Sequence, residues 1–118
     1  LVSGISTLLD KSKVPWVQRL SDSNEIIAHT VTTTTVSAEI ARHGIERIDL
    51  LKVDVEGYFL EVLKGIDEAD FAKIGNIVIE IDYASEAGAD APDVARMLEA
   101  KGFQTEFKED LTFYAWRR

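Results

Sequence analysis

Two short and almost uninterrupted apolar runs constrain the fold of this chain more than any other feature. They cover Ile48–Val55 and Ile77–Asp82, and a segment with helical periodicity lies between them. Neither run alternates cleanly between apolar and polar residues, which indicates strands covered on both faces, as in a parallel sheet flanked by helices. The sequence therefore predicts an α/β fold with right-handed crossovers between the parallel strands.

Three stretches end in a basic residue followed by glycine, which is typical of helix C-termini. They predict helices over about Val36–His43, Tyr58–Lys64 and Ala91–Lys101. Thr35 is the expected N-cap of the first helix and Asp90 that of the third, which has a proline in its first turn.

The two ends of the chain differ in character. After the third helix, Phe103–Phe107 and Leu111–Trp116 flank a polar turn, so they predict a C-terminal antiparallel hairpin. Residues 1–25 are interpreted as a loop-rich upstream segment. In Ile26–Val36 a run of threonines favours a strand with a polar face. The folded part is therefore expected to comprise residues 26–118.

Four carboxylates lie at the ends of the two apolar runs, at the place where open α/β sheets bind ligands. Asp54 and Glu56 end the first run, and Glu80 and Asp82 end the second. Such a group can hold a cation, accept hydrogen bonds from a substrate hydroxyl or amine, or act as a general base. Helix capping and solvated loop ends are the structural alternative for each of these acids.

Three other polar residues carry weaker signals. Lys52 interrupts an apolar strand and, if buried, needs an acidic partner, so a structural ion pair is favoured over a catalytic lysine. His43 is interpreted as a cation at a helix C-terminus, and His29 lacks metal-ligand spacing. No metal site is predicted.

Composition excludes several classes of function. The 118 residues include 13 Lys+Arg and 21 Asp+Glu, a net charge of −8, which argues against electrostatic binding of nucleic acid or anionic membranes. No cysteine is present for a disulfide or a thiol nucleophile. Neither a signal peptide nor an apolar run of about 20 residues is found, so we expect no membrane span and a cytoplasmic location.

Two further absences shape the functional interpretation. The chain begins at Leu1 and its one methionine is Met97, so we expect it to be a segment of a longer protein. The seven glycines, at positions 4, 44, 57, 65, 75, 88 and 102, form no glycine-rich nucleotide-binding loop.

The stretch Ile48–Gly65 resembles the signature of FkbM-type methyltransferases, which are S-adenosylmethionine-dependent enzymes with a class I Rossmann-like fold. The specific part is Lys52–Gly57 together with Leu63–Gly65. The similarity continues into Ile77–Asp82, where Glu80 occupies the family's usual acidic position, and it covers roughly residues 26–116. Where the family commonly has a small residue and then Glu, this chain has Tyr-Phe after its Asp-x-Glu-Gly element, a bulkier and less charged rim.

The resemblance implies that this is the C-terminal half of the fold, because the family's first strands and its cofactor loop are not in the sequence. It implies methyl transfer from S-adenosylmethionine to a hydroxyl group of a small-molecule or carrier-bound acceptor. Asp54 and Glu56 would border the cofactor and the methyl-transfer site, with Glu80 and Asp82 beside the acceptor. The fragment alone is expected to be inactive.

A different class of function remains open: a non-catalytic structural or dimerising remnant inside a multidomain synthase. Without the fold's first strand, Leu50–Val55 would present an unpaired apolar edge, which favours association. We expect this edge to be covered by the threonine-rich strand, by a second copy in a homodimer, or by upstream chain. A phosphatase-like Asp-x-Asp site has less support, because the second acid is Glu56.

Overall fold

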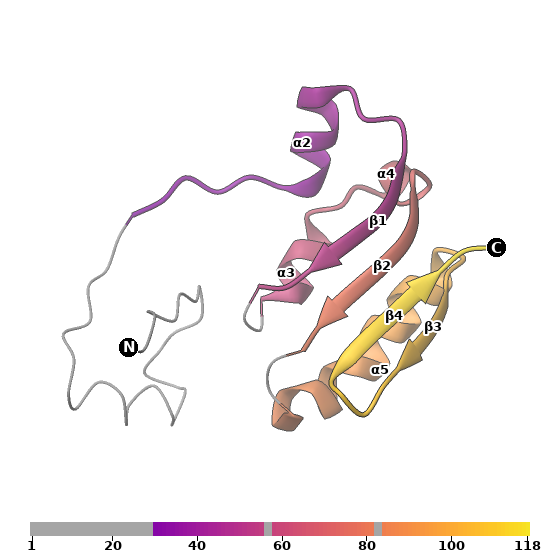
Figure 1. The fold of residues 1–118 in the computed structure, drawn as a ribbon. Coiled ribbons are helices and arrows are strands. Elements are labelled where there is room, and N and C mark those ends of the chain that lie inside the picture. Colours follow the sequence, from indigo (N-terminus) through magenta and orange to yellow (C-terminus); the bar gives the residue numbers. More distant parts are fainter. Residues whose placement is uncertain (1–29, 56–57, 82–83) are drawn as a thin grey trace.

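The computed structural model describes residues 30–55, 58–81 and 84–118, with side chains in 84–90 left out of the description. Figure 1 shows the order of the elements along this part of the chain. They are α2 (Val36–His43), β1 (Ile48–Val53), α3 (Phe59–Lys64), α4 (Glu68–Phe71), β2 (Ile74–Glu80), α5 (Ala84–Ala100), β3 (Gln104–Phe107) and β4 (Thr112–Trp116).

The strands form one mixed sheet in the order β1-β2-β4-β3. β1 and β2 are parallel, in a register that runs from Ile48 opposite Ile74 to Val53 opposite Ile79. β4 is antiparallel to both β2 and β3. The predicted α/β class and the predicted C-terminal hairpin are therefore confirmed.

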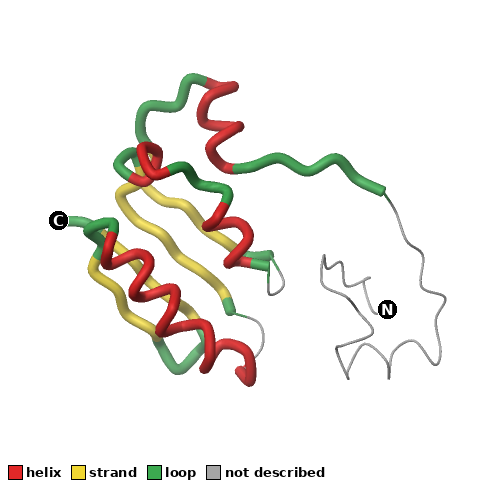
Figure 2. The backbone as a smooth tube through the Cα atoms, turned by 180° about the vertical axis from the view of Figure 1, so that it is seen from behind, coloured by secondary structure: helices red, strands yellow, loops and turns green. Residues whose placement is uncertain are grey.

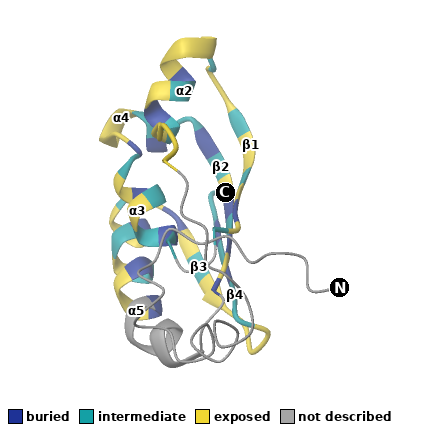
Figure 3. Cartoon of the chain, turned by 90° about the vertical axis from the view of Figure 1, so that its left-hand side faces the viewer, coloured by how far each residue is buried: buried dark blue, intermediate teal, exposed yellow. Residues whose placement is uncertain are grey.

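The described helices lie on one side of this sheet, as Figures 2 and 3 show from two directions. Alternate residues of the central strands point into that helical layer and are almost fully buried. The largest of these core side chains are Phe113, Leu63, Ile74, Ile77, Ile79, Ile81, Leu98 and Val94. Because side chains alternate along a strand, the residues between them face the other side, where no described helix lies.

The prediction that both faces of the strands are covered is wrong for β1. Leu50 is 57% exposed, and Lys52 and Glu80 are exposed on the same open face. β1 is an edge strand in the described part of the chain, since only β2 pairs with it there. The expected threonine-rich strand is absent from residues 30–35, which run as an extended segment away from the sheet (Figure 1). This part of the segment does not cover the β1 edge, and residues 26–29 lie outside the description.

The first predicted helix is confirmed at both ends. The Thr35 hydroxyl accepts a hydrogen bond from the Ala38 N–H at 3.1 Å, so Thr35 is the N-cap. Gly44 follows the helix with φ of 60°, a left-handed conformation that glycine adopts at low cost. The second helix begins at Phe59 instead of Tyr58. The Gly65 that follows it has φ of −81°, so this glycine is needed for another reason.

Gly65 permits close contact between α2 and the segment after α3. A Cβ atom at position 65 would lie 3.2 Å from the Thr35 Cβ. Ser37, the one polar residue found buried in the described chain, donates its N–H to the Gly65 carbonyl at 3.2 Å. Its hydroxyl oxygen accepts the Asp67 N–H at 2.7 Å. These contacts attach α2 to the rest of the fold.

The third helix was predicted too short. α5 begins at Ala84, so Asp90 lies inside it and is not its N-cap, and Pro92 is an interior residue. Proline usually marks a first turn because it lacks an N–H, but here the alanine-rich stretch before it continues the helix. The predicted glycine stop is confirmed, since Gly102 has φ of 86°. No helix in the described ranges has the length and apolar character that a membrane crossing requires.

Candidate functional site

The parallel pairing of β1 and β2 brings the carboxyl ends of both strands to one edge of the sheet. Asp54 directly follows β1, and Glu80 is the last residue of β2. The other two predicted site residues, Glu56 and Asp82, lie outside the described residues. The site can therefore be built from Asp54 and Glu80, which lie at the ends of different strands but at the same edge of the sheet.

Lys52 joins these two carboxylates. Its Nζ atom lies 3.1 Å from Asp54 Oδ2 and 3.6 Å from Glu80 Oε2. The register explains this geometry: Lys52 is opposite Val78, and each carboxylate lies two residues beyond one member of that pair, on the same face. The structure thus places one cation between two acids that the sequence separates by 26 residues (80 − 54).

The cluster of Lys52, Asp54 and Glu80 is open to solvent. The three side chains are 58%, 43% and 50% exposed, respectively. The predicted ion pair of Lys52 is confirmed, but its premise of burial is wrong, because the open face of the sheet leaves the lysine accessible. Exposed ion pairs contribute little to folding stability, so this cluster is not explained by a need to hold the fold together.

Electrostatics keep Lys52 charged. The hydrogen bond to Asp54 and then the attraction of that carboxylate raise the pKa of Lys52, and Glu80 adds to the effect. Lys52 is therefore an ammonium ion at neutral pH and does not serve as a general base. The carboxylate oxygens are left as the proton acceptors of the cluster, within reach of a ligand on the open face.

Metal ligation gains no support from the described residues, among which no three His, Asp or Glu side chains gather at ligand spacing. His43 lies in the last turn of α2, as predicted. The second histidine, His29, lies outside the description.

A second feature, which the sequence did not predict, is a groove at the opposite, amino end of β1. It has a volume of about 330 Å³ and an apolar floor between α2 and α3. Its lining comprises Thr34, Thr35, Val36, Glu39, Ile40, Ile45, Ile48, Glu61, Val62 and Gly65. These residues come from three separate elements, so no local sequence signal marks the groove.

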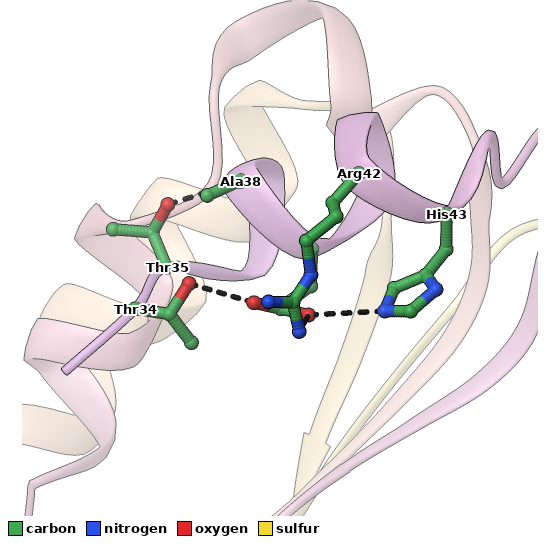
Figure 4. A network of polar contacts seen from close by, with 6 residues as sticks. Thr34, Thr35, Ala38, Arg42 and His43 are labelled. Atoms are coloured by element: carbon green, nitrogen blue, oxygen red, sulfur yellow. Dashed lines mark hydrogen bonds and ion pairs between the residues drawn. The ribbon is translucent and has the colours of Figure 1, made fainter. Parts of the chain in front are cut away.

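One wall of this groove carries a polar network, shown in Figure 4. Glu39 accepts a hydrogen bond from Thr34 Oγ1 at 2.9 Å and another from Arg42 Nη2 at 2.7 Å. His43 Nε2 lies 3.3 Å from the same carboxylate. The hydrogen bond from Thr34 is the largest cause that lowers the pKa of Glu39, and Arg42 and His43 act in the same direction. The network ties the end of α2 to the segment that precedes it.

Comparison with known proteins points to one family. The model of the "Methyltransferase FkbM domain" family matches residues 3–105. Methyltransferase sdnD of Sordaria araneosa is 52% identical over 60 residues, which are 51% of this chain and 22% of that protein. The 31-O-demethyl-FK506 methyltransferase FkbM of Streptomyces tacrolimicus is 34% identical over 95 residues, 80% of this chain and 35% of the relative.

A third relative is much longer than the chain. The AMB antimetabolite synthetase AmbE of Pseudomonas aeruginosa is 36% identical over 95 residues, which are 77% of this chain and 4% of the synthetase. In all three relatives the matched region is less than half of the whole protein. No solved structure gives a significant match.

Proposed function

The chain belongs to the FkbM methyltransferase family, and on that basis we propose that it forms the acceptor side of an S-adenosylmethionine-dependent methyl-transfer site. One observation carries this proposal: the carboxylates of Asp54 and Glu80 both contact the Lys52 ammonium at the carboxyl edge of β1 and β2. Ligands of open α/β sheets bind beyond this edge. The family signature and the acidic edge therefore coincide in the chain.

The proposed fold context is the C-terminal half of a class I, Rossmann-like methyltransferase domain over residues 26–118. Two parallel strands joined through helices, followed by an antiparallel hairpin, support it. Residues 1–25 would precede this half as an upstream segment. The proposal also agrees with the small part of each relative's length that the matched region covers, 22% and 35%.

The chemistry of the acidic edge fits one part of S-adenosylmethionine. Carboxylates at an open edge suit the cofactor's cationic sulfonium and ammonium groups, whereas the seven glycines of the chain provide no phosphate-type or nucleotide cradle. Asp54 and Glu56 would therefore border the cofactor without enclosing it. S-adenosylmethionine, when bound, supplies the methyl group from its sulfonium centre.

The chain's own residues then have a limited task. Methyl transfer needs in-line positioning of the acceptor oxygen and a group that takes its proton. Asp54 or Glu56 would orient and deprotonate an acceptor hydroxyl, and Glu80 and Asp82 would contact the acceptor. The acceptor would be a small molecule or a carrier-bound substrate, and the name of the 31-O-demethyl-FK506 methyltransferase agrees with a small molecule.

Isothermal titration of S-adenosylmethionine tests the proposal. It is run on the 118-residue chain and on a polypeptide extended upstream by about 100 residues, roughly half a domain of this type. We expect heat of binding only from the longer polypeptide. Absence of binding by both, with both folded, would contradict a methyltransferase site.

A second candidate is a structural module that associates through β1. It is favoured by the outer edge of β1, which has no strand partner in the described chain, and by Leu50, which is 57% exposed beside it. We propose a homodimer through this edge as its assembly. Light scattering of the wild type and of Leu50→Lys tests it: a folded variant with halved mass supports the dimer, and a wild-type monomer excludes it.

A further inference from the structure

We propose that Lys52 is a positioning residue of this site, whose side chain holds the Asp54 and Glu80 carboxylates side by side at the edge of the sheet. The inference rests on the proposed methyl-transfer function. Lys52 is argued to act through the two acids, without touching the reacting atoms.

The sheet register creates the need for such a residue. The last pair of the parallel ladder is Val53 with Ile79, so the next position places Asp54 beside Glu80. Two like charges that neighbour each other across strands repel. Without a cation between them, the two exposed side chains would turn away from each other into solvent. Lys52, two residues before Asp54 on the same face, is placed to prevent this.

The contacts of Lys52 differ from those of an ordinary surface lysine. Lys64 on α3 is equally exposed, at 60%, and its ammonium contacts one carboxylate, Glu61, at 2.7 Å one helical turn away. Lys52 contacts two carboxylates that come from two strands. The Lys64 pair links two residues of the same helix. Lys52 instead links the carboxylates of two different strand ends and so sets their position relative to each other.

The two alternative roles of Lys52, stabilising the fold and accepting a proton, fit the structure less well than a positioning role. Its partners are about half exposed, so the pairs contribute little to stability. Its raised pKa keeps it protonated, which excludes a role as the base. What remains is geometry: a cation 3.1 Å from one carboxylate and 3.6 Å from the other determines where the oxygen atoms of both acids lie.

Steady-state methyl transfer by the complete protein tests the proposal, with labelled S-adenosylmethionine and 31-O-demethyl-FK506 as the probe acceptor. The variants are Lys52→Met, which removes the cation, Lys52→Arg, which keeps it, and Lys64→Met as the matched control. We expect Lys52→Met to lower kcat by about 10- to 100-fold, the size of effect that misplacement of reacting groups produces. The loss should be larger in kcat than in the KM for S-adenosylmethionine, and the urea midpoint should stay unchanged. Lys52→Arg should recover most of the rate, and Lys64→Met should match the wild type.

A double-mutant cycle asks whether Lys52 acts through the acids. If it does, Lys52→Met should cost clearly less activity in a Glu80→Gln background than in the wild type, because the repulsion between Asp54 and Glu80 is then already absent and only the contact with Asp54 is lost. Independent, multiplicative losses would overturn the proposal. A Lys52→Met variant as active as the wild type would also overturn the positioning role, but it would not contradict the methyl-transfer function. A wild type that neither binds S-adenosylmethionine nor transfers its methyl group would instead contradict the function itself, and the positioning role with it.

Discussion

The two faces of the sheet are built from the same strands but have opposite properties. On the helix-covered face, Ile77 and Ile79 have no exposed surface and Phe113 is 1% exposed. On the open face, Leu50 is 57% exposed and Lys52 is 58% exposed at its side chain. The covered face therefore provides stability through burial of apolar surface, and the open face provides accessible charge. Removing a side chain from each face should have different consequences.

The largest difference is expected between neighbouring residues of β4. Phe113→Ala should lower the free energy of unfolding by about 3–5 kcal/mol, because it leaves a cavity in the core. Tyr114→Ala, on the open face, should cost clearly less, since its ring is only half-buried and its removal leaves no enclosed cavity. Urea denaturation of both variants measures the contrast. Equal losses would mean that the open face is also a packed interface.

A smaller effect is expected where α2 joins the helical layer. Gly65→Ala should lower the free energy of unfolding by about 1–3 kcal/mol, because the new Cβ would meet Thr35 at 3.2 Å. Gly75→Ala is the matched control, since its Cβ would meet the Asp49 carbonyl at an ordinary 3.4 Å. Thermal unfolding of the two variants gives the comparison. A neutral Gly65→Ala would show that α2 is loosely attached.

The smallest effect concerns pH. The hydrogen bond from Lys73, and then that from Ser37, lower the pKa of Asp70 below its ordinary value of 3.8. Its ionised form therefore stabilises the fold above that pH, and the contribution is lost as the pH falls through the lowered pKa of the folded state.

Asp70→Asn should thus be less stable than the wild type at neutral pH, and the two should converge below about pH 3.8. Asp49→Asn provides the control, because Asp49 is 77% exposed whereas Asp70 is 14% exposed. Urea midpoints across the acid range measure both variants. A constant difference at every pH would assign the effect of Asp70→Asn to something other than ionisation.

Local signals explain which parts of the fold could be predicted. The Thr35 cap and the Gly44 stop define α2 within ten residues, and a polar turn between two alternating stretches defines the hairpin. The start of α5 was mispredicted because Pro92 resembles a first-turn residue. Burial was mispredicted for Leu50, because the exposure of a strand residue depends on which elements cover its face, and those are distant in sequence.

The candidate site was also predictable only where the signal is local in the sequence. Asp54 directly follows β1 and Glu80 is the last residue of β2, so the rule for open α/β sheets found them. That Lys52 contacts both acids depends on the register between β1 and β2, which no local pattern contains. Ser37 escaped prediction because its hydroxyl is paired with a backbone group 30 residues away.

The most direct test of the account compares two aspartates at opposite ends of β1. Asp54 lies at the carboxyl end beside Lys52, and Asp49 lies near the amino end beside Arg47. Methyl transfer from labelled S-adenosylmethionine is measured for Asp54→Asn and Asp49→Asn in the complete protein. We predict that Asp54→Asn lowers kcat by about 10²- to 10⁴-fold, the range for loss of a general base, and that Asp49→Asn equals the wild type. Equal rates for the two variants would contradict a role of Asp54 in a methyl-transfer site at the carboxyl edge of the sheet.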